Sequence, residues 1–363
     1  MQFCRTSKSE ITGRPTIVGT GLVALDVLLH GGSDAPDTSL GGSAGNVLAI
    51  LGHLGWKSVP VAQLGADEAA EEIWREFAKL GAETRFLWRD KAYCTPVIFQ
   101  LPGTGESTHQ FSFRCPACGR KRAFTPPLLD QKSAALLGNI ETPDVFYFDR
   151  VTPWALELAE RYRSLGTLVV FEPSLVESDH AAFARALQAT NVLKYADERI
   201  LELDQFDRSS IDVEVQTQGK RGLRFRSHSQ PGAWHSLGAF QVPYLEDTAG
   251  AGDWCTAGFL FALIGSIFEK GGKGFISMRR IRESLRFGQV LAALNCMESG
   301  ARGLARSHSS KEIVYLAASI RNDSSTFATP VDAPALPLAT PVQSKTPAFP
   351  FPSTFLCCET LAG

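Results

Sequence analysis

Short apolar segments alternate with helix-like segments along most of this chain, and this alternation is the feature that most limits its fold. Buried strands are expected at 16–19, 59–62, 145–148, 168–171 and 192–194, and helices at 67–80, 153–165 and 179–189. Helical crossovers of this length join parallel strands, whereas antiparallel strands can be joined by a tight turn. The sequence therefore predicts an α/β protein in which helices cover both faces of a mostly parallel central sheet.

Two regions depart from this rhythm. Between 93 and 115 apolar and polar residues alternate, which predicts a β-hairpin outside the parallel sheet, and short β-like runs between 213 and 243 predict an antiparallel edge. Residues 1–14 are polar, and we expect them to form a flexible leader. Prolines recur among Ser, Thr and Ala in 321–363, so this segment is predicted to be a disordered tail that follows one domain at 15–320.

The composition argues against several classes of protein. A formal net charge of −2 gives no basic excess for binding nucleic acid or a membrane surface. No apolar run reaches the roughly 18 residues of a membrane-spanning helix, and the polar N-terminus has no apolar signal core. We therefore expect a cytoplasmic protein, in which the eight scattered cysteines remain free thiols.

The segment 247–253, with the sequence DTAGAGD, is the strongest indication of chemistry. Its glycines let the backbone approach a ligand closely. The helix-like run that follows offers unpaired N–H groups and the positive end of a helix dipole, which favour a bound phosphate. Beside this anion hole, Asp253 can take the proton of a substrate hydroxyl as a phosphoryl group arrives. The structural alternative is a glycine-rich turn with Asp253 as a helix cap.

Three segments together resemble the ribokinase-like sugar kinases of the PfkB family. DTAGAGD is similar to the C-terminal signature of that family, GGSAGNV at 41–47 to its N-terminal signature, and TQGKRG at 217–222 to its nucleotide loop. The resemblance covers about residues 15–320. It implies a ribokinase-like three-layer α/β/α sandwich with a small β lid, built from parts of 27–40 and 93–115, that closes over the substrate and excludes water.

The resemblance also implies the roles of individual residues. Substrate hydroxyls would be bound by Asp26, Gly41, Gly42, Asn46 and Asp253. The amides of Gly250, Ala251 and Gly252 would hold the transferred phosphoryl group, with Asp253 as the catalytic base. ATP would be bound by Thr217, Gly219, Gly222 and Asn295. For Asp26 and Asn295 the sequence alone also allows an interpretation without a functional role. Asp26 would then be an acid in a solvated loop, and Asn295 a polar residue on the surface.

Metal binding is where the sequence departs from the family. Ala196 and Arg199 stand where many members have an asparagine and a glutamate that organise magnesium and phosphate. Glu198 would replace that glutamate through a shift of one position, or the magnesium site is weaker. In many members the first aspartate of the signature, Asp247 here, helps to hold a monovalent cation such as K⁺, together with a turn that 299–301 resembles.

Cys115 and Cys118 have the spacing of half a zinc ribbon, but a structural zinc needs about four ligands and no second pair lies nearby in the sequence. Cys94, His109 or a second subunit would have to complete such a site. The other interpretation of CPAC is a plain hairpin turn.

Three functions remain open at this level. The first is ATP- and Mg²⁺-dependent phosphorylation of a sugar or sugar-like alcohol. The second is phosphorylation of a nucleoside by the same chemistry. The third is a catalytically weak member that binds a small molecule, which the departures at Ala196 and Arg199 motivate. The resemblance further implies a homodimer formed through the lid.

Overall fold

The computed structural model describes residues 2–4, 13–29, 36–102, 109–227, 233–268 and 273–322. Its central sheet has nine strands in the order β14-β13-β12-β11-β10-β9-β2-β5-β6. The strands are β2 (Thr16–Thr20), β5 (Lys57–Leu64), β6 (Leu87–Arg89), β9 (Val145–Phe148), β10 (Leu168–Phe171), β11 (Val192–Ala196), β12 (Val213–Thr217), β13 (Leu223–Ser227) and β14 (His235–Leu237). From β12 to β6 all neighbours pair in parallel, while β13 and β14 add an antiparallel edge.

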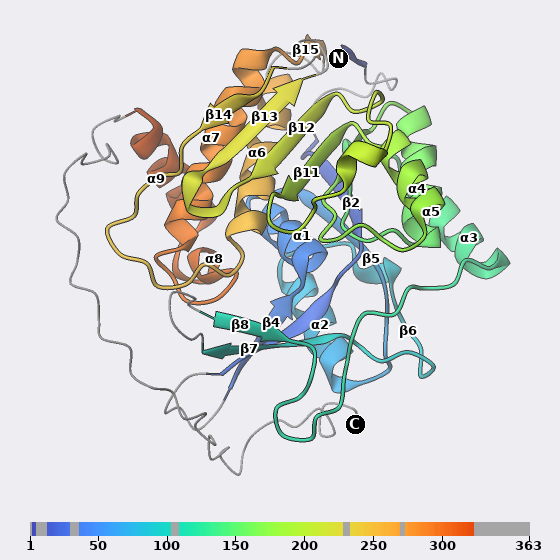
Figure 1. Ribbon diagram of the computed structural model, residues 1–363. Coiled ribbons are helices and arrows are strands. Elements are labelled where there is room, and N and C mark those ends of the chain that lie inside the picture. Colours follow the sequence, from blue (N-terminus) through green and yellow to red (C-terminus); the bar gives the residue numbers. More distant parts are fainter. Residues whose placement is uncertain are drawn as a thin grey trace.

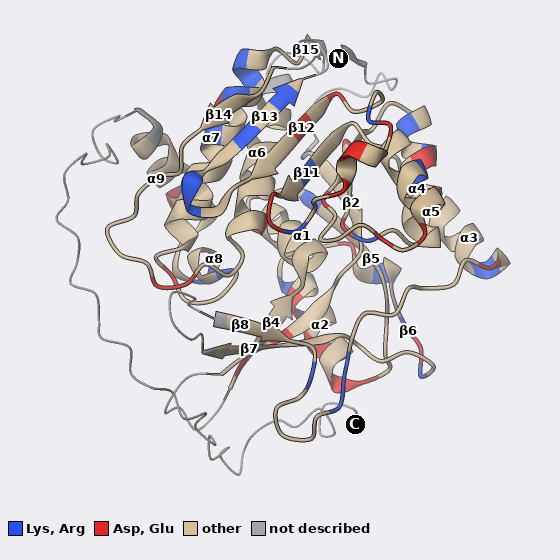
Figure 2. Ribbon diagram, viewed as in Figure 1, with Lys and Arg blue, Asp and Glu red and all other residues tan. Residues whose placement is uncertain are grey.

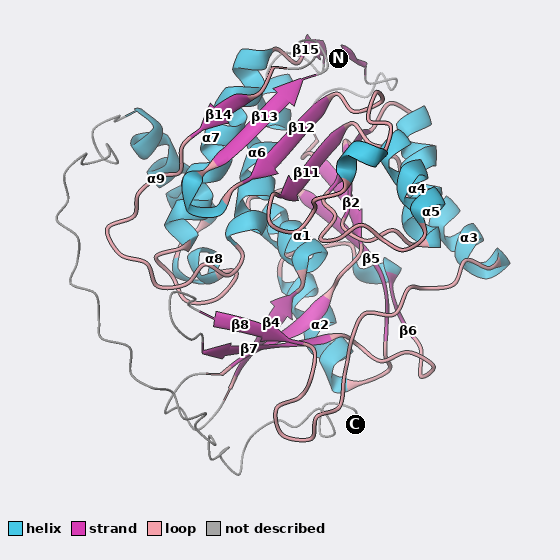
Figure 3. Ribbon diagram, in the orientation of Figure 1, coloured by secondary structure: helices cyan, strands magenta, loops and turns pink. Residues whose placement is uncertain are grey.

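Helices cover both faces of this sheet (Figures 1 and 3). They are α1 (Ser43–His53), α2 (Glu68–Lys79), α3 (Gln131–Gly138), α4 (Pro153–Ser164), α5 (His180–Gln188), α6 (Ala251–Phe268), α7 (Met278–Asn295), α8 (Gly303–Ser307) and α9 (Ser310–Asn322). Side chains of β2 alternate between two hydrophobic clusters: Ile17 packs with α1, α6 and α7, and Val18 with α4 and α5. The predicted three-layer α/β/α architecture is confirmed.

A second sheet of four strands lies apart from these layers, at the lower edge of Figure 1. Its order is β4 (Asp37–Gly41), β3 (Ala24–Leu28), β7 (Val97–Pro102) and β8 (His109–Ser112). The strands β7 and β8 form the hairpin expected between 93 and 115. The small sheet thus contains segments from both parts of the chain that were predicted to build the lid, although β3 begins before residue 27.

The ends of the chain differ in part from expectation. Gln2–Cys4, within the leader that was expected to be flexible, forms β1 and pairs antiparallel with β15 (Lys273–Phe275). The backbone of this segment forms hydrogen bonds with β15. The expectation of flexibility was based on the polar side chains, which do not indicate whether the backbone pairs with another strand. At the other end α9 continues through Asn322. Most of the predicted tail, from residue 323 onward, lies outside the described residues.

Charged side chains of both signs are interspersed over the fold (Figure 2). In the antiparallel edge, for example, Arg226 of β13 forms a 2.6 Å ion pair with Glu214 of β12. Arg208 pairs with the same carboxylate at 2.9 Å. Glu214 thus pairs with two arginines, whereas Arg224 of β13 donates to the neutral side chain of Gln216 at 2.6 Å.

A buried ion pair fastens the small sheet to the rest of the domain. Arg122, which is 3% exposed in its side chain, pairs with Asp67 at the start of α2. Asp67 also accepts from Ala70 N at 3.0 Å, as the helix cap, and from Thr95 Oγ1 at 2.6 Å. Since Thr95 lies just before β7, these contacts form a clamp between α2 and the β7–β8 hairpin.

We predict that Arg122→Met lowers the free energy of unfolding by about 3–5 kcal/mol, because it leaves the Asp67 carboxylate buried without its partner. The matched control is Lys57→Met, which breaks the exposed 3.2 Å pair with Glu141 and should change stability by less than about 1 kcal/mol. Urea unfolding of both variants measures the difference. Equal losses in the two variants would contradict a clamp at Asp67.

Candidate active site

The candidate site lies at the carboxyl ends of the parallel strands, where open α/β sheets bind ligands. Asp149 follows β9 directly, Glu172 follows β10, and Lys194 belongs to β11. The helix α6 begins at this edge, since Lys194 Nζ donates to the carbonyl oxygen of Gly252 at 3.3 Å. The fold thereby brings charged groups from three strands to the N-terminal turn of α6.

The two signature segments meet at a hydrogen bond between Asn46 and Asp253. Asn46 Nδ2 in α1 donates to Asp253 Oδ2 in α6 at 2.8 Å. Asn46 is buried, and its Oδ1 has no hydrogen-bond partner within the described part of the chain. The amide therefore orients the Asp253 carboxyl while keeping one acceptor available.

The glycine loop before α6 is held in place by the segment that follows α7. Gly250 has a φ of +73°, and a Cβ at this position would lie 2.2 Å from the carbonyl oxygen of Ala301. Only glycine permits both the left-handed backbone and this close approach. Trp254 Nε1 reinforces the contact by donating to the same oxygen at 3.1 Å.

This loop leaves some of its amides unpaired. In the described parts of the chain the N–H groups of Gly250 and Gly252 have no hydrogen-bond acceptor, and Gly252 is exposed. The Ala251 N–H, in contrast, donates to Thr248 O at 3.3 Å within the turn. The expectation that all three amides point to a ligand is therefore corrected for Ala251, because the turn uses its N–H.

The environment of Asp253 favours its protonated form. Its pKa is raised well above the ordinary value, first by burial and then by the negative charge of Glu172. The hydrogen bond from Asn46 and the positive charge of Lys194 oppose this shift, while Asp149 adds to it. A carboxyl group with a raised pKa is suited to accept a proton, since its basicity is higher than that of an exposed carboxylate.

Asp26 in β3 lies against the start of α1. A Cβ on Gly41 would come within 1.9 Å of the Asp26 carboxyl carbon, so residue 41 must be glycine for this packing. The backbone of Gly42 donates to the carboxyl, but Asp26 Oδ1 is buried without a hydrogen-bond partner among the described residues. Burial raises the pKa of Asp26 to about 7, although the nearby positive charge of Arg302 lowers it. The alternative of a solvated loop acid is therefore wrong.

The expected nucleotide loop follows β12. Thr217 ends the strand, and its carbonyl oxygen accepts from Asp197 N at 3.0 Å. Gly219 and Gly222 both have a positive φ and bracket a short turn whose Arg221 pairs with Asp197 at 2.5 Å. The loop 217–222 therefore lies beside the turn that contains Ala196 and Glu198.

Asn295 is neither a surface residue nor a group open to a nucleotide. It is fully buried, its Nδ2 donates to Ala249 O at 3.0 Å, and its Oδ1 accepts from Leu304 N at 3.1 Å. These bonds tie the end of α7 to the glycine loop and to α8. The predicted contact of this side chain with ATP is corrected, because its polar atoms are used inside the protein.

Asp247 is also engaged within the protein. Its carboxylate accepts from Ala249 N at 2.9 Å, Gly300 N at 2.9 Å and Gln100 Nε2 at 2.8 Å. The expected proximity to the 299–301 turn is present. Three N–H donors occupy most of the acceptor positions of one carboxylate, however, so these contacts give no support for a cation ligand at this side chain.

The remaining expectations about metals concern Glu198 and the cysteine pair. Glu198 is exposed in the turn after β11. Cys115 is buried and Cys118 exposed, and Gly119 N donates to Cys115 O at 2.8 Å, as in a closed turn. Over the ranges that the structure describes, no group of three or more His, Cys, Asp or Glu side chains is placed to hold a metal ion.

Four residues of this site were absent from the sequence interpretation: Asp149, Glu172, Lys194 and Arg302. Asp149 and Glu172 each come directly after a segment expected to be a buried strand, so the rule that ligands bind at carboxyl ends of parallel strands is the signal that points to them. Lys194 was assigned to a strand, and its burial has no local sequence signal. Arg302 donates to Leu40 O at 2.6 Å, a contact between segments 262 positions apart.

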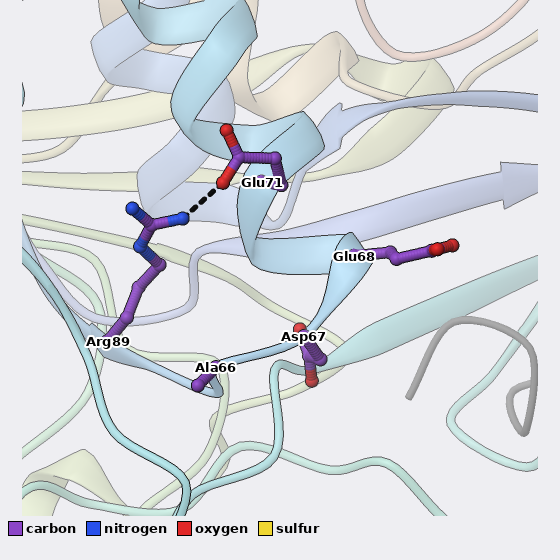
Figure 4. A pocket seen from close by; sticks show the side chains of 5 residues that line it. All are labelled: Ala66, Asp67, Glu68, Glu71 and Arg89. Atoms are coloured by element: carbon purple, nitrogen blue, oxygen red, sulfur yellow. Dashed lines mark hydrogen bonds and ion pairs between the residues drawn. The ribbon is translucent and has the colours of Figure 1, made fainter. Parts of the chain in front are cut away.

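A separate surface hollow of about 340 Å³ lies at the start of α2 (Figure 4). Ala66, Asp67, Glu68, Glu71 and Arg89 line it, and Glu71 and Arg89 point toward one another as an ion pair. None of the residues around Asp253 contributes to this hollow.

In the described ranges no helix has both the length and the apolar character needed to span a lipid bilayer.

The raised pKa of Asp26 predicts a pH dependence of stability. The folded state binds this proton more tightly than the unfolded state, in which the pKa is 3.8, so the stabilisation is complete below pH 3.8 and is lost as the pH rises through about 7. Relative to Asp26→Asn, the wild-type protein should therefore lose unfolding free energy between pH 4 and pH 7. Urea unfolding at a series of pH values measures this, and parallel curves for the two proteins would contradict the assignment.

Comparison with known proteins gives two curated relatives. The bifunctional protein HldE of Mesorhizobium japonicum is 28% identical over 252 residues, which is 65% of this chain and 48% of that protein. The fructokinase of Solanum tuberosum is 26% identical over 303 residues, covering 79% of this chain and 87% of that protein. This chain thus spans about half the length of the first relative and most of the second. No family model matches the chain.

Solved structures share the architecture described above. The fructokinase of Xylella fastidiosa with bound ATP superposes with a TM-score of 0.64 at 20% identity, covering 85% of this chain and 99% of that one. The aminoimidazole riboside kinase of Salmonella enterica, complexed with aminoimidazole riboside and an ATP analogue, gives 0.60 at 18% identity over 83% and 99% of the two chains. At such identities the structural likeness establishes the fold. The chain therefore has the three-layer α/β/α fold of these kinases, the fold that the resemblance implied, and its sequence is similar to the two curated relatives.

Proposed function

We propose that this protein transfers the γ-phosphoryl group of ATP to a hydroxyl of a sugar or sugar-like small molecule, with Asp253 as the catalytic base. One observation carries the proposal: a carboxyl group of raised pKa lies beside unpaired amides at the N-terminus of α6. This arrangement combines an acceptor for a hydroxyl proton with donors for a migrating anion. The relatives named above include fructokinases and a riboside kinase, which act on substrates of this class.

The polar atoms on the substrate side support a hydroxylated acceptor. Asp26 Oδ1 and Asn46 Oδ1 are buried acceptors without partners in the described part of the chain. Leaving such atoms unpaired costs roughly 1–3 kcal/mol each, and a ligand that donates hydrogen bonds removes this penalty. Sugar hydroxyls are donors of this kind. Gly41 and Gly42 would let the ligand approach the backbone between these two side chains.

In the proposed reaction the substrate hydroxyl lies beside the hydrogen-bonded side chains of Asn46 and Asp253. Its oxygen attacks the γ-phosphorus, its proton passes to the Asp253 carboxylate, and the bond from the phosphorus to the bridging oxygen of ADP breaks. The N–H groups of Gly250 and Gly252 would stabilise the charge on the transferred group. Because the reaction needs ionised Asp253, its raised pKa predicts that activity falls as the pH becomes acidic.

The nucleotide would be bound beside the loop 217–222, with Thr217, Gly219 and Gly222 near the phosphates. Magnesium, when bound with ATP, neutralises charge on the phosphates. Glu198 offers an exposed carboxylate in the adjacent turn, a ligand type that Mg²⁺ prefers. Closure of the small sheet over the substrate as a lid, and pairing of two chains through that lid, remain part of the proposal.

A nucleoside kinase of the same fold is the second candidate, and the riboside kinase similarity favours it. Purified protein with ATP and Mg²⁺ should be assayed for ADP release against hexoses, pentoses, sugar acids and nucleosides. Turnover with one class identifies the acceptor. Ligand-induced thermal stabilisation without turnover would instead support a catalytically weak binding protein, which Ala196 and Arg199 also motivate.

We predict that Asp253→Asn lowers kcat by about 10²–10⁴-fold with the best acceptor, because the amide cannot take the hydroxyl proton. Thermal shift with ATP–Mg²⁺ should still report nucleotide binding, since the substitution leaves the loop 217–222 in place. Glu141→Gln, at an exposed carboxylate of the 3.2 Å pair with Lys57, is the control and should keep full activity. An Asp253→Asn enzyme with wild-type kcat would rule out Asp253 as the base.

A further inference from the structure

A buried charged pair lies directly behind Asp253. Lys194 Nζ forms an ion pair with Glu172 Oε1, and the two side chains are only 4% and 15% exposed. Burial lowers the pKa of Lys194, but the negative charge of Glu172 and its hydrogen bond, together with Cys255 and Asp253, leave that pKa above its ordinary value, so the lysine stays protonated. Burying two charges is expensive, and hydrophobic replacements of similar volume are often no less stable. Stability alone therefore gives a weak reason for this pair.

Both members of the pair are bonded to the first turn of α6. Lys194 Nζ donates to Gly252 O at 3.3 Å. Thr256 Oγ1 lies 2.6 Å from Glu172 Oε2 and 3.1 Å from Gly252 O, so one hydroxyl spans the turn. The pair thereby fixes the peptide group between Gly252 and Asp253. This peptide group lies next to the unpaired N–H groups of the glycine loop. Tyr147 completes the surroundings by donating to Glu172 Oε2 at 3.3 Å.

The charges that face Asp253 come from several elements. Glu172 from β10 and Asp149 from β9 are negative, and Lys194 from β11 is the positive charge that opposes them. Asp149 is itself paired with Arg150 at 3.4 Å. The neutral groups nearby are Asn46, which donates to Asp253, Tyr147 and the buried thiol of Cys255, whose pKa burial raises. Lys194 and Glu172 thus act on Asp253 with opposite signs.

We propose that Glu172 and Lys194 are a pair of positioning residues that hold the first turn of α6 and balance the charge beside Asp253. The inference rests on the proposed role of Asp253 as the base. Neither side chain takes or gives the reaction's proton. Lys194 favours the ionised form of Asp253 and Glu172 favours the protonated form, while the bonds of both residues to the first turn of α6 hold the Gly252 peptide in place.

Two single substitutions separate this proposal from a purely structural role. Lys194→Met removes the positive charge, so the acidic limb of the kcat/KM pH profile should move to higher pH, with roughly tenfold lower kcat/KM on that limb. Glu172→Gln removes the negative charge but keeps hydrogen-bonding atoms, so the limb should move to lower pH. The double variant removes one charge of each sign and should return the limb close to its wild-type position.

The matched control is the exposed pair Lys57–Glu141, for which Lys57→Met and Glu141→Gln should leave the profile unchanged. If Lys194→Met does not fold, Glu172→Gln and the double variant still decide the question. Limbs that stay in place, or that move in the same direction in both single variants, overturn the proposal. Lower kcat with an unmoved limb would be the result for a merely structural pair.

A second measurement does not depend on turnover. In protein labelled with ¹³C at aspartate carboxyl carbons, the signal lost in Asp253→Asn identifies Asp253, and its titration should shift upward in Lys194→Met and downward in Glu172→Gln. If the protein has no kinase activity but these titration shifts are observed, the proposed function is wrong and the proposed effect of the pair on Asp253 still holds. An active enzyme without these shifts refutes the pair alone.

Discussion

The hydrogen bond from Asn46 to Asp253 joins two segments 207 positions apart, and the arrangement of the site depends on it. It fixes α1 against the first turn of α6. The proposed substrate-binding side chains and the proposed anion-binding amides are therefore held in a fixed position relative to one another. The fold makes this contact possible because α1 and α6 pack on the same face of the parallel sheet. A change that separates these helices would therefore disturb both halves of the site together.

Much of the fold follows from local sequence patterns. Buried strands such as Val145–Phe148 and Leu168–Phe171 are short apolar runs bounded by turn residues, and their boundaries were predicted correctly. The glycine loop was proposed because its glycines permit close approach of the backbone to a ligand, and Asn46 was proposed from the resemblance. Lys194 was not found, because a lysine in a strand carries no local sign of whether tertiary packing will bury it. Asn295 was misassigned for the same reason, since its partners Ala249 and Leu304 become neighbours only in the folded chain.

The site concentrates carboxyl groups that an ordinary core would exclude. Asp26, Asp149, Glu172 and Asp253 all lie near the carboxyl ends of strands or the start of a helix, and two of them have raised pKa values. Stability and chemistry oppose each other here, because a buried carboxyl group with unpaired oxygens destabilises the free protein. The carboxyl groups differ in this respect. Asp149 and Glu172 accept hydrogen bonds from other groups of the protein, whereas one oxygen of Asp26 has no partner in the described ranges.

The contact of Gly250 with Ala301, together with the bonds of Arg302 to Leu40 and Glu76, has a consequence for biosynthesis. During translation the strands and helices up to Thr217 leave the ribosome before the segment that shapes the glycine loop has been made. A nascent chain that ends before residue 301 lacks the backbone surface on which Gly250 rests and the guanidinium that ties this segment to β4. All nine strands of the central sheet are synthesised before the segment that shapes the site, and the site becomes complete only after Arg302 has left the exit tunnel.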